Sequence, residues 1–315
     1  MSDSSAGLLF LVGSTASGKT ALAIALAKAS GAEIISSDSV QVYRELVIGS
    51  ARPSEAELAE VPHHFVGHVS VASEYTAGTF EREALELIRS NPEKRYIVCG
   101  GSGFYVQALM KGMYPIEKAD PELQAIIERR IDTEGLAAIY RELVEKDPEA
   151  ARTIAEQDRY RIVRALEIME SQGGEKLSDI KRRFEESSQF RFPGRKIGTI
   201  GLRLARPSLE ARVVARTSLM IKLGLIDEVK GLIEKGYSDR PALQSVGYRE
   251  TLDHLAGRLV LSELEAAIVK GTMRLAKKQR TWFSRDPSAF WIDSELELEL
   301  AKKYAAEFFT SNTID

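Results

Sequence analysis

One segment near the start of the chain narrows the possible folds more than any other, and it reads Gly13-Ser14-Thr15-Ala16-Ser17-Gly18-Lys19-Thr20. An apolar run at residues 8–13 leads into it, and a mostly apolar stretch at residues 20–29 follows it and stops before Gly31. This order predicts a buried strand, a tight loop and a helix with a glycine C-cap. Backbone N–H groups, the positive helix end and Lys19 would surround an anion, and the Thr20 hydroxyl can ligate Mg2+. We interpret the segment as a phosphate-binding loop; the alternative is a glycine-rich turn without a ligand.

Four more apolar runs of strand length follow along the chain, at residues 33–37, 95–99, 197–204 and 290–292. Helical patterns separate the runs, as the crossover connections between parallel strands require. We therefore expect an α/β fold with a parallel-sheet core of the P-loop NTPase type and a helical insertion domain.

The insertion is expected between Pro115 and Pro193, where the sequence contains helical patterns and no strand-like run. These patterns cover residues 121–131, 135–146 and 148–171, and Asp120 and Asp147 each precede a proline in the order typical of a helix start. We expect residues 116–196 to form the insertion, and residues 1–115 and 197–315 to form the α/β core. Further helices in the core are predicted at residues 208–235, 262–285 and 296–309.

The composition excludes several classes of protein. A chain of 315 residues with 44% hydrophobic and 28% charged residues is neither a disordered polymer nor a small disulfide scaffold. Its single cysteine, Cys99, is compatible with a reducing compartment. The first residues lack the pattern of a signal peptide, and no apolar run is long enough to span a bilayer. We expect a cytoplasmic protein that does not enter a membrane.

A second candidate site follows the run at residues 33–37, where Asp38-Ser39-Val40-Gln41 places a carboxylate and an amide beyond the predicted strand. Ligands of open α/β sheets bind at this carboxyl edge, which also carries the phosphate-binding loop. A local role stays open as well, because an aspartate at this position could cap the next helix. The two roles do not exclude each other.

The phosphate-binding loop and the block from Ser37 to Tyr43 resemble those of the tRNA dimethylallyltransferases, also called tRNA isopentenyltransferases. Later blocks resemble those of this family in the same order. They are Ile48-Gly49-Ser50-Ala51-Arg52-Pro53, Pro62-His63-His64, Gly100-Gly101-Ser102-Gly103-Phe104-Tyr105, Asp158 to Arg161 with Arg164-Ala165-Leu166-Glu167, Val246-Gly247-Tyr248-Arg249-Glu250 and Ala276-Lys277-Lys278-Gln279-Arg280-Thr281-Trp282-Phe283. The resemblance extends from about residue 8 to residue 293.

The resemblance implies transfer of a dimethylallyl group from dimethylallyl diphosphate to the exocyclic N6 of the adenosine directly 3′ of the anticodon in tRNA, with Mg2+ and release of diphosphate. The implied catalytic residues are Asp38 as general base, Thr20 as the Mg2+ ligand and Arg216 as a contact to the diphosphate. The diphosphate is implied to bind the loop of residues 13–20. The implied tRNA contacts are Asp38, Ser39, Val40, Gln41, Ser102, Gln157, Asp158, Arg159, Tyr160, Arg161, Val246, Gly247, Tyr248 and Arg249. We expect the insertion to contact tRNA and the protein to be a monomer.

Basic residues are unevenly distributed, although the net charge is −3. Residues 159–216 contain 14 Lys and Arg against 7 Asp and Glu, and residues 270–285 contain 6 basic residues and no acidic one. Four aromatic residues are interleaved with the first group: Tyr160, Phe184, Phe190 and Phe192. They could stack on an unstacked base, although we expect two or three of them to pack in the core instead. Such regions are typical of a surface that binds a phosphate backbone, and a solvated helix face is the alternative.

Three other functions remain open from the sequence. A small-molecule kinase would use the same loop to bind a nucleoside triphosphate. An adenylate isopentenyltransferase would take a free nucleotide as acceptor, although the basic regions argue against it. A non-catalytic RNA-binding protein would use the loop to hold a nucleotide as a switch.

Overall fold

The computed structural model describes residues 6–113, 120–187, 191–192 and 195–310. The chain divides into two compact units, one formed by Met1–Leu109 with Phe192–Asp315 and the other by Met110–Arg191. The first unit is α/β and the second is helical, and each is described by itself. No helix within the described ranges has both the length and the apolar character needed to cross a membrane.

The α/β unit is built on a six-stranded parallel sheet with the strand order β3-β2-β4-β1-β5-β6. The strands are β1 (Gly7–Gly13), β2 (Glu33–Ser36), β3 (His63–His64), β4 (Tyr96–Gly100), β5 (Lys196–Arg203) and β6 (Phe290–Asp293). The five strands expected from the apolar runs are confirmed, and β3 is an additional short edge strand. Because β4 lies between β1 and β2, the loops that follow these three strands meet at one edge of the sheet.

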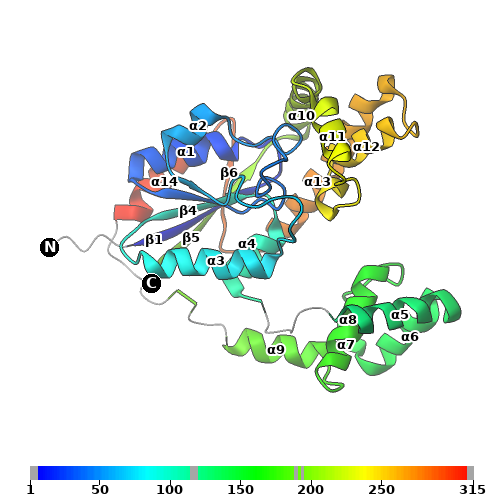
Figure 1. Cartoon of the computed structure of the whole chain (residues 1–315). Coiled ribbons are helices and arrows are strands. Elements are labelled where there is room, and N and C mark those ends of the chain that lie inside the picture. The colour runs from blue at the N-terminus through cyan, green and yellow to red at the C-terminus, as the bar shows by residue number, and fades with distance from the viewer. Residues whose placement is uncertain (1–5, 114–119, 188–190, 193–194, 311–315) are drawn as a thin grey trace. The chain divides into compact units, whose positions relative to one another are not determined.

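Helices cover both faces of this sheet, as the α/β prediction requires (Figure 1). One face is covered by α1 (Lys19–Ser30) and α14 (Leu298–Thr310), and the other by α3 (Ala77–Ser90) and α4 (Gly103–Lys111). Residues 8–11 of β1, which is central in the sheet, have no exposed surface. The predicted C-cap of α1 is confirmed, because Gly31 has a φ of 67° and its N–H donates to the carbonyl oxygen of Ala27.

A second group of helices gathers at one end of the sheet (Figure 1). It contains α10 (Arg206–Lys222), α11 (Leu225–Glu234), α12 (Tyr248–Leu255) and α13 (Leu261–Phe283). The expectation of one helix over residues 208–235 is wrong. Gly224 has a left-handed φ of 99° and separates α10 from α11, which lets the chain change direction there.

The helical unit has a hydrophobic core of its own. It contains α5 (Pro121–Glu134), α6 (Leu136–Lys146), α7 (Pro148–Ala151), α8 (Arg159–Ser171) and α9 (Leu177–Ser187). Ile139, Leu143, Ile162 and Leu166 have no exposed surface and belong to one cluster. The inward faces of α6 and α8 therefore pack against each other, as their apolar spacing predicts.

Two of the helix starts in this unit are those that the sequence predicts, but one predicted helix is divided into two. Asp120 and Asp147 accept backbone N–H groups at the starts of α5 and α7, which confirms both predicted starts. The expectation of one helix over residues 148–171 is wrong, because α7 ends at Ala151 and Asp158 caps a new helix, α8.

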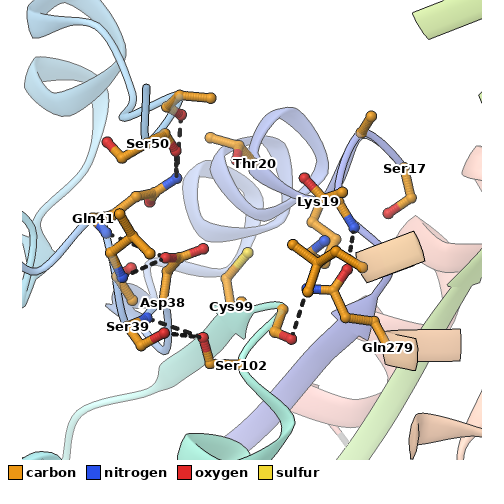
Figure 2. A pocket seen from close by; sticks show the side chains of 18 of the residues that line it. Ser17, Lys19, Thr20, Asp38, Ser39, Gln41, Ser50, Cys99, Ser102 and Gln279 are labelled. Carbon is orange, nitrogen blue, oxygen red and sulfur yellow. Dashed lines mark hydrogen bonds between the residues drawn. The ribbon is translucent and has the colours of Figure 1, made fainter. Parts of the chain in front are cut away.

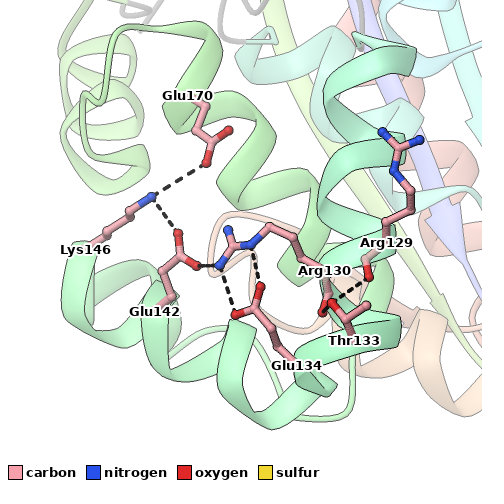
Figure 3. A network of polar contacts seen from close by, with 7 residues as sticks. All are labelled: Arg129, Arg130, Thr133, Glu134, Glu142, Lys146 and Glu170. Carbon is pink, nitrogen blue, oxygen red and sulfur yellow. Dashed lines mark hydrogen bonds and ion pairs between the residues drawn. The ribbon is translucent and has the colours of Figure 1, made fainter.

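An ion network links α5, α6 and α8 within this unit (Figure 3). Arg130 lies 2.9 Å from Glu134 and 2.7 Å from Glu142, and Lys146 lies 2.7 Å from Glu142 and 3.7 Å from Glu170. Partly exposed pairs of this kind contribute at most about 1 kcal/mol each to the free energy of unfolding. The network aligns the helices, while the apolar core supplies most of their stability.

Candidate active site

A cavity of about 1010 Å³ opens at the carboxyl edge of the sheet. It is lined by the segments that follow β1, β2 and β4, together with side chains from α10 and α13. This is where ligands bind in open parallel sheets. The predicted phosphate-binding loop and Asp38 therefore share one cavity.

The loop between β1 and α1 has the backbone shape that its glycines predict. Gly13 and Gly18 have φ values of 152° and 92°, which side-chain-bearing residues rarely adopt. Lys19 folds back across the loop, and its Nζ donates to the Ser14 carbonyl oxygen at 2.6 Å. The buried Ser17 hydroxyl has no hydrogen-bond partner in the part of the chain that the structure describes, so this donor is available to an anion.

Two cations lie at this loop, and both are poorly hydrated. Burial lowers the pKa of Lys19 from 10.5 to about 8. Burial also lowers the pKa of Arg216 on α10, whose Nη2 donates to Thr15 Oγ1 at 2.7 Å. The charge of Asp38 acts in the opposite direction on both groups. Two desolvated cations beside backbone N–H donors form a site that favours an anionic ligand.

Asp38 follows β2 and stabilises a turn. Its Oδ1 accepts backbone N–H groups from Val40 at 2.9 Å and from Gln41 at 3.2 Å. The idea that Asp38 caps the next helix is corrected, because these bonds close a turn and the next helix, α2 (Glu55–Glu60), is capped by Ser54. Figure 2 shows the carboxylate turned into the cavity, on the side of Lys19. One oxygen thus fixes the orientation of the carboxylate while the other faces the cavity.

The segments after β2 and β4 are joined directly beside Asp38 (Figure 2). Ser102 Oγ accepts the Ser39 N–H at 2.9 Å and donates to Ser39 Oγ at 3.1 Å. Gln41 Nε2 donates to the carbonyl oxygens of residues 50 and 51, at 3.3 and 3.1 Å. Ser39, Val40, Gln41 and Ser102, which are predicted tRNA contacts, line the cavity with Asp38.

Gln279 on α13 also lines the cavity, although sequence reasoning did not single it out. Its Oε1 accepts the Thr15 N–H at 2.8 Å, and its Nε2 donates to the Gly101 carbonyl oxygen at 2.9 Å. In the sequence, Gln279 was marked only as a member of the block 276–283, one of the blocks that resemble those of the family. Nothing in the spacing of the chain connects it with Thr15 or Gly101.

The predicted contacts at residues 246–249 differ in their accessibility. Val246 and Gly247 line the cavity, and Arg249 has about half of its side chain exposed. Tyr248 is fully buried, and its hydroxyl donates to Glu228 Oε1 at 2.7 Å. The buried Tyr248 side chain therefore contacts Glu228, and the tRNA contact expected at residue 248 stays a prediction.

Glu228 on α11 is the second functional residue that sequence reasoning missed. Besides the Tyr248 hydroxyl, its carboxylate accepts the backbone N–H groups of residues 47, 48 and 49 at 2.8–3.2 Å. A Cβ on Gly49 would lie 2.6 Å from the Tyr248 ring, so a glycine is required at this contact. Glu228 and Tyr248 thus hold the loop whose carbonyl groups orient Gln41.

The five predicted contacts at residues 157–161 belong to the helical unit. Asp158 caps α8 by accepting the Arg161 N–H at 3.2 Å, and Gln157 precedes it on the surface. Tyr160 is 76% exposed, and Arg159 pairs with acidic side chains of α5. The turn that begins α8 therefore presents an exposed aromatic side chain next to basic ones.

The other aromatic residues that were expected among the basic residues differ from Tyr160. Phe192 is buried in the α/β unit. Phe184 is partly buried near Gly112 in the helical unit, and Phe190 lies outside the described residues. Among the described aromatic residues of this set, exposure favours Tyr160 for stacking on a base.

One face of α13 carries exposed basic side chains, here called the α13 basic row: Lys270, Arg274, Lys277 and Lys278. None of the four forms an ion pair with another described residue. Lys278 lines the large cavity, whereas Lys270 and Arg274 line a smaller one of about 260 Å³ beside α12. The row therefore extends from the smaller cavity to the wall of the larger one.

Comparisons with known proteins identify relatives over most of the chain. The profile of the IPP transferase family matches residues 41–286. The tRNA dimethylallyltransferase of Bdellovibrio bacteriovorus is 42% identical, over 91% of this chain and 92% of its own. That of Geobacter sulfurreducens is 37% identical, over 96% of both chains.

Solved structures give the same result. The tRNA isopentenylpyrophosphate transferase of Bacillus halodurans matches with a TM-score of 0.70 at 30% identity, over 96% of this chain and 97% of its own. A eukaryotic dimethylallyltransferase acting on tRNA matches with a TM-score of 0.80 at 25% identity, over 99% of this chain and 81% of its own. The P-loop NTPase-like fold expected from the sequence is confirmed, and the chain belongs to the IPP transferase family, that of the tRNA dimethylallyltransferases.

Proposed function

We propose that this protein transfers the dimethylallyl group of dimethylallyl diphosphate to the exocyclic N6 of the adenosine directly 3′ of the anticodon in tRNA. The observation that carries the proposal is the single cavity that holds both an anion-binding loop and the Asp38 carboxylate. A kinase or an enzyme acting on free nucleotides is not favoured, because the relatives found by comparison are named for a tRNA substrate.

The donor is proposed to bind with its diphosphate on the loop of residues 13–20. Breaking the bond between C1 of the allyl group and its oxygen places negative charge on the departing diphosphate. Lys19, Arg216 and N–H groups of the loop lie together at the cavity, so they would be in place to meet this charge. Donors arranged in advance stabilise such a transition state more than mobile water does.

Mg2+ fits the donor side of the cavity. This ion takes oxygen ligands and usually binds through one or two protein groups together with substrate phosphates. The Thr20 hydroxyl, at the last residue of the loop, is an oxygen donor at the cavity wall that could bind the ion. The described residues contain no group of three His, Cys, Asp or Glu side chains suited to a metal. When bound at Thr20, Mg2+ would supply positive charge to the diphosphate.

On the acceptor side, Asp38 is proposed to be the general base. The N6 lone pair is delocalised into the purine, so the amine becomes a useful nucleophile only as its proton is removed. The N6–C1 bond forms, the C1–O bond breaks, and the N6 proton passes to the Asp38 carboxylate. Ser39, Val40, Gln41 and Ser102 would hold the extruded base beside it, because they share the same cavity wall.

The rest of the RNA is proposed to bind to basic and polar surfaces of both units. In the helical unit these include Gln157, Asp158, Arg159, Tyr160 and Arg161. In the α/β unit they include Val246, Gly247 and Arg249 together with the α13 basic row. We propose that one copy of the chain suffices, because the described α/β unit by itself supplies the groups for both donor and base.

Incubation of the protein with dimethylallyl diphosphate, Mg2+ and unmodified tRNA tests the proposal. We expect mass spectrometry of the digested nucleosides to show a dimethylallyl adenosine. Parallel reactions with AMP, and with ATP and small acceptors, should give no product. Prenylated AMP with unmodified tRNA would contradict the proposal, and so would phosphoryl transfer from ATP.

The pKa of Lys19 gives the donor a pH-dependent affinity. Lys19 is protonated below its pKa of about 8, and the donor anion favours the protonated form. We therefore expect donor affinity to be highest near pH 7, to fall as pH rises through 8, and to level off about tenfold lower once Lys19 is neutral. Isothermal titration with dimethylallyl diphosphate between pH 7 and 9.5 measures this, since the phosphate groups are already ionised there.

Lys19→Met is the matched variant for this titration. It should bind the donor about tenfold more weakly at pH 7 and lose the fall in affinity above pH 8. If the donor affinity of Lys19→Met still falls above pH 8 as that of the wild-type protein does, the titrating group is a residue other than Lys19.

A further inference from the structure

The Gln279 side chain bridges two parts of the active cavity that are far apart in sequence. Its Oε1 accepts the Thr15 N–H of the phosphate-binding loop, and its Nε2 donates to the carbonyl oxygen of Gly101 after β4. A single amide thus uses both its acceptor and its donor, at 2.8 and 2.9 Å. Figure 2 shows Gln279 between these two hydrogen bonds at the cavity wall.

The close approach of α13 to this segment is built into the sequence. A Cβ on Gly101 would lie 2.5 Å from Gln279 Nε2, and a Cβ on Gly103 would lie 2.4 Å from the Trp282 ring. Gln279 and Trp282 are three residues apart and share a face of the helix. The two glycines and the two α13 side chains therefore form one interlocked contact.

Hydrogen bonds continue from this contact toward Asp38. Gly101 is followed by Ser102, whose Oγ accepts the Ser39 N–H at 2.9 Å. Ser39 lies next to Asp38, whose own orientation depends on the N–H groups at residues 40 and 41. The path from Thr15 to Asp38 thus consists of hydrogen bonds and adjacent residues of the chain.

We propose that Gln279 is a positioning residue that holds the phosphate-binding loop in register with Ser102 and, through it, with Asp38. The inference rests on the proposed function, because it assigns the leaving group to one end of the path and the base to the other. In-line transfer requires the allylic carbon, the departing oxygen and N6 to be aligned, and a displacement of about 1 Å can cost up to a hundredfold in rate. Gln279 contacts neither reacting atom and acts through the two backbone segments.

Gln279→Leu tests the bridge, because leucine fills a similar volume and removes both hydrogen bonds. We expect kcat for prenyl transfer to fall about tenfold, while KM for dimethylallyl diphosphate and for the tRNA anticodon stem-loop changes less than about threefold. Ser284→Ala is the control, because it removes a hydrogen bond at the end of the same helix outside the cavity lining. Its kcat should equal that of the wild-type protein.

Gln279→Glu gives a second, isosteric test. The new carboxylate can accept the Thr15 N–H, but only its protonated form can also donate to Gly101. The ratio of variant to wild-type kcat should therefore rise as the pH is lowered.

A Gln279→Leu variant with wild-type kcat would overturn the bridge. If that variant does not fold, a pH-independent ratio for Gln279→Glu would overturn it instead. If the wild-type protein does not prenylate RNA, the proposed function and the role of Gln279 are both refuted. If the wild-type protein is active and the Gln279 variants have the same kcat, only the role of Gln279 is refuted.

Discussion

Asp38→Asn is expected to lower kcat for prenyl transfer by about two to four orders of magnitude. Asparagine retains an Oδ1 that can accept the N–H groups of Val40 and Gln41, so the turn after β2 is preserved. The variant loses the basicity that removes the N6 proton, and it also loses the negative charge that acts on Lys19 and Arg216, so the donor is kept saturating in the rate measurement. RNA affinity should therefore change by only a few fold. Single-turnover assays with saturating donor measure the first quantity, and a binding titration with tRNA measures the second.

Asp293 provides a matched control for this substitution. It ends β6, and its Oδ1 accepts the N–H groups two and three residues ahead, at 2.8 and 3.2 Å, as that of Asp38 does. It does not line the cavity. Asp293→Asn should leave kcat unchanged. That result would show that the same substitution at an equivalent turn does not itself lower turnover, so a lower kcat in Asp38→Asn comes from the lost carboxylate. Near-normal turnover in Asp38→Asn would remove Asp38 from the role of general base.

Local features of the α/β unit were predictable because neighbouring residues determine them. The run at residues 8–13 is apolar because β1 is covered on both faces, and Gly31 ends α1 because its backbone is left-handed. Asp120 and Asp147 signal helix starts for the same local reason. Placing Asp38 at the cavity also followed from sheet topology, since the carboxyl ends of parallel strands share an edge.

The missed features depend on contacts between distant parts of the chain. Glu228 contacts residues 47–49, about 180 positions away in the sequence. Gln279 contacts Thr15, which is 264 positions away, and Gly101, which is 178 positions away. No periodicity or short motif encodes such pairs. The burial of Tyr248 was missed for a related reason, because its partner Glu228 lies on another helix.

The distribution of charge shows a further limit of counting residues. Residues 159–216 are rich in basic side chains, but Arg182 pairs with Glu149 and Asp179, and Arg183 pairs with Glu175. Such arginines must give up an existing partner before they bind a phosphate group. The α13 basic row has no such pairs among the described residues, although its segment has fewer basic residues than the first region.

Neutralising the α13 basic row is therefore expected to weaken tRNA binding strongly. In the triple variant Lys270→Gln, Arg274→Gln and Lys277→Gln, we expect the affinity at about 0.1 M salt to fall roughly a hundredfold. Each lost phosphate contact removes about 0.7 to 0.9 from the slope of log affinity against log salt, so the loss of three contacts should decrease the slope by about 2 to 3. Lys278 is left unchanged because it lines the active cavity. Filter binding of tRNA over a series of salt concentrations measures both quantities.

A variant of α14 separates this local effect from the change in net charge. Lys302 pairs with Glu299, and Lys303 lies 3.9 Å from Glu307, on a helix that packs against the sheet and does not line the cavity. Lys302→Gln with Lys303→Gln should leave the affinity within a few fold and the salt slope unchanged. If instead both variants lowered the slope in proportion to the charges removed, RNA would respond to the net charge of the protein. The α13 basic row would then have no special place in binding, because only specific phosphate contacts make the slope depend on where a charge is removed.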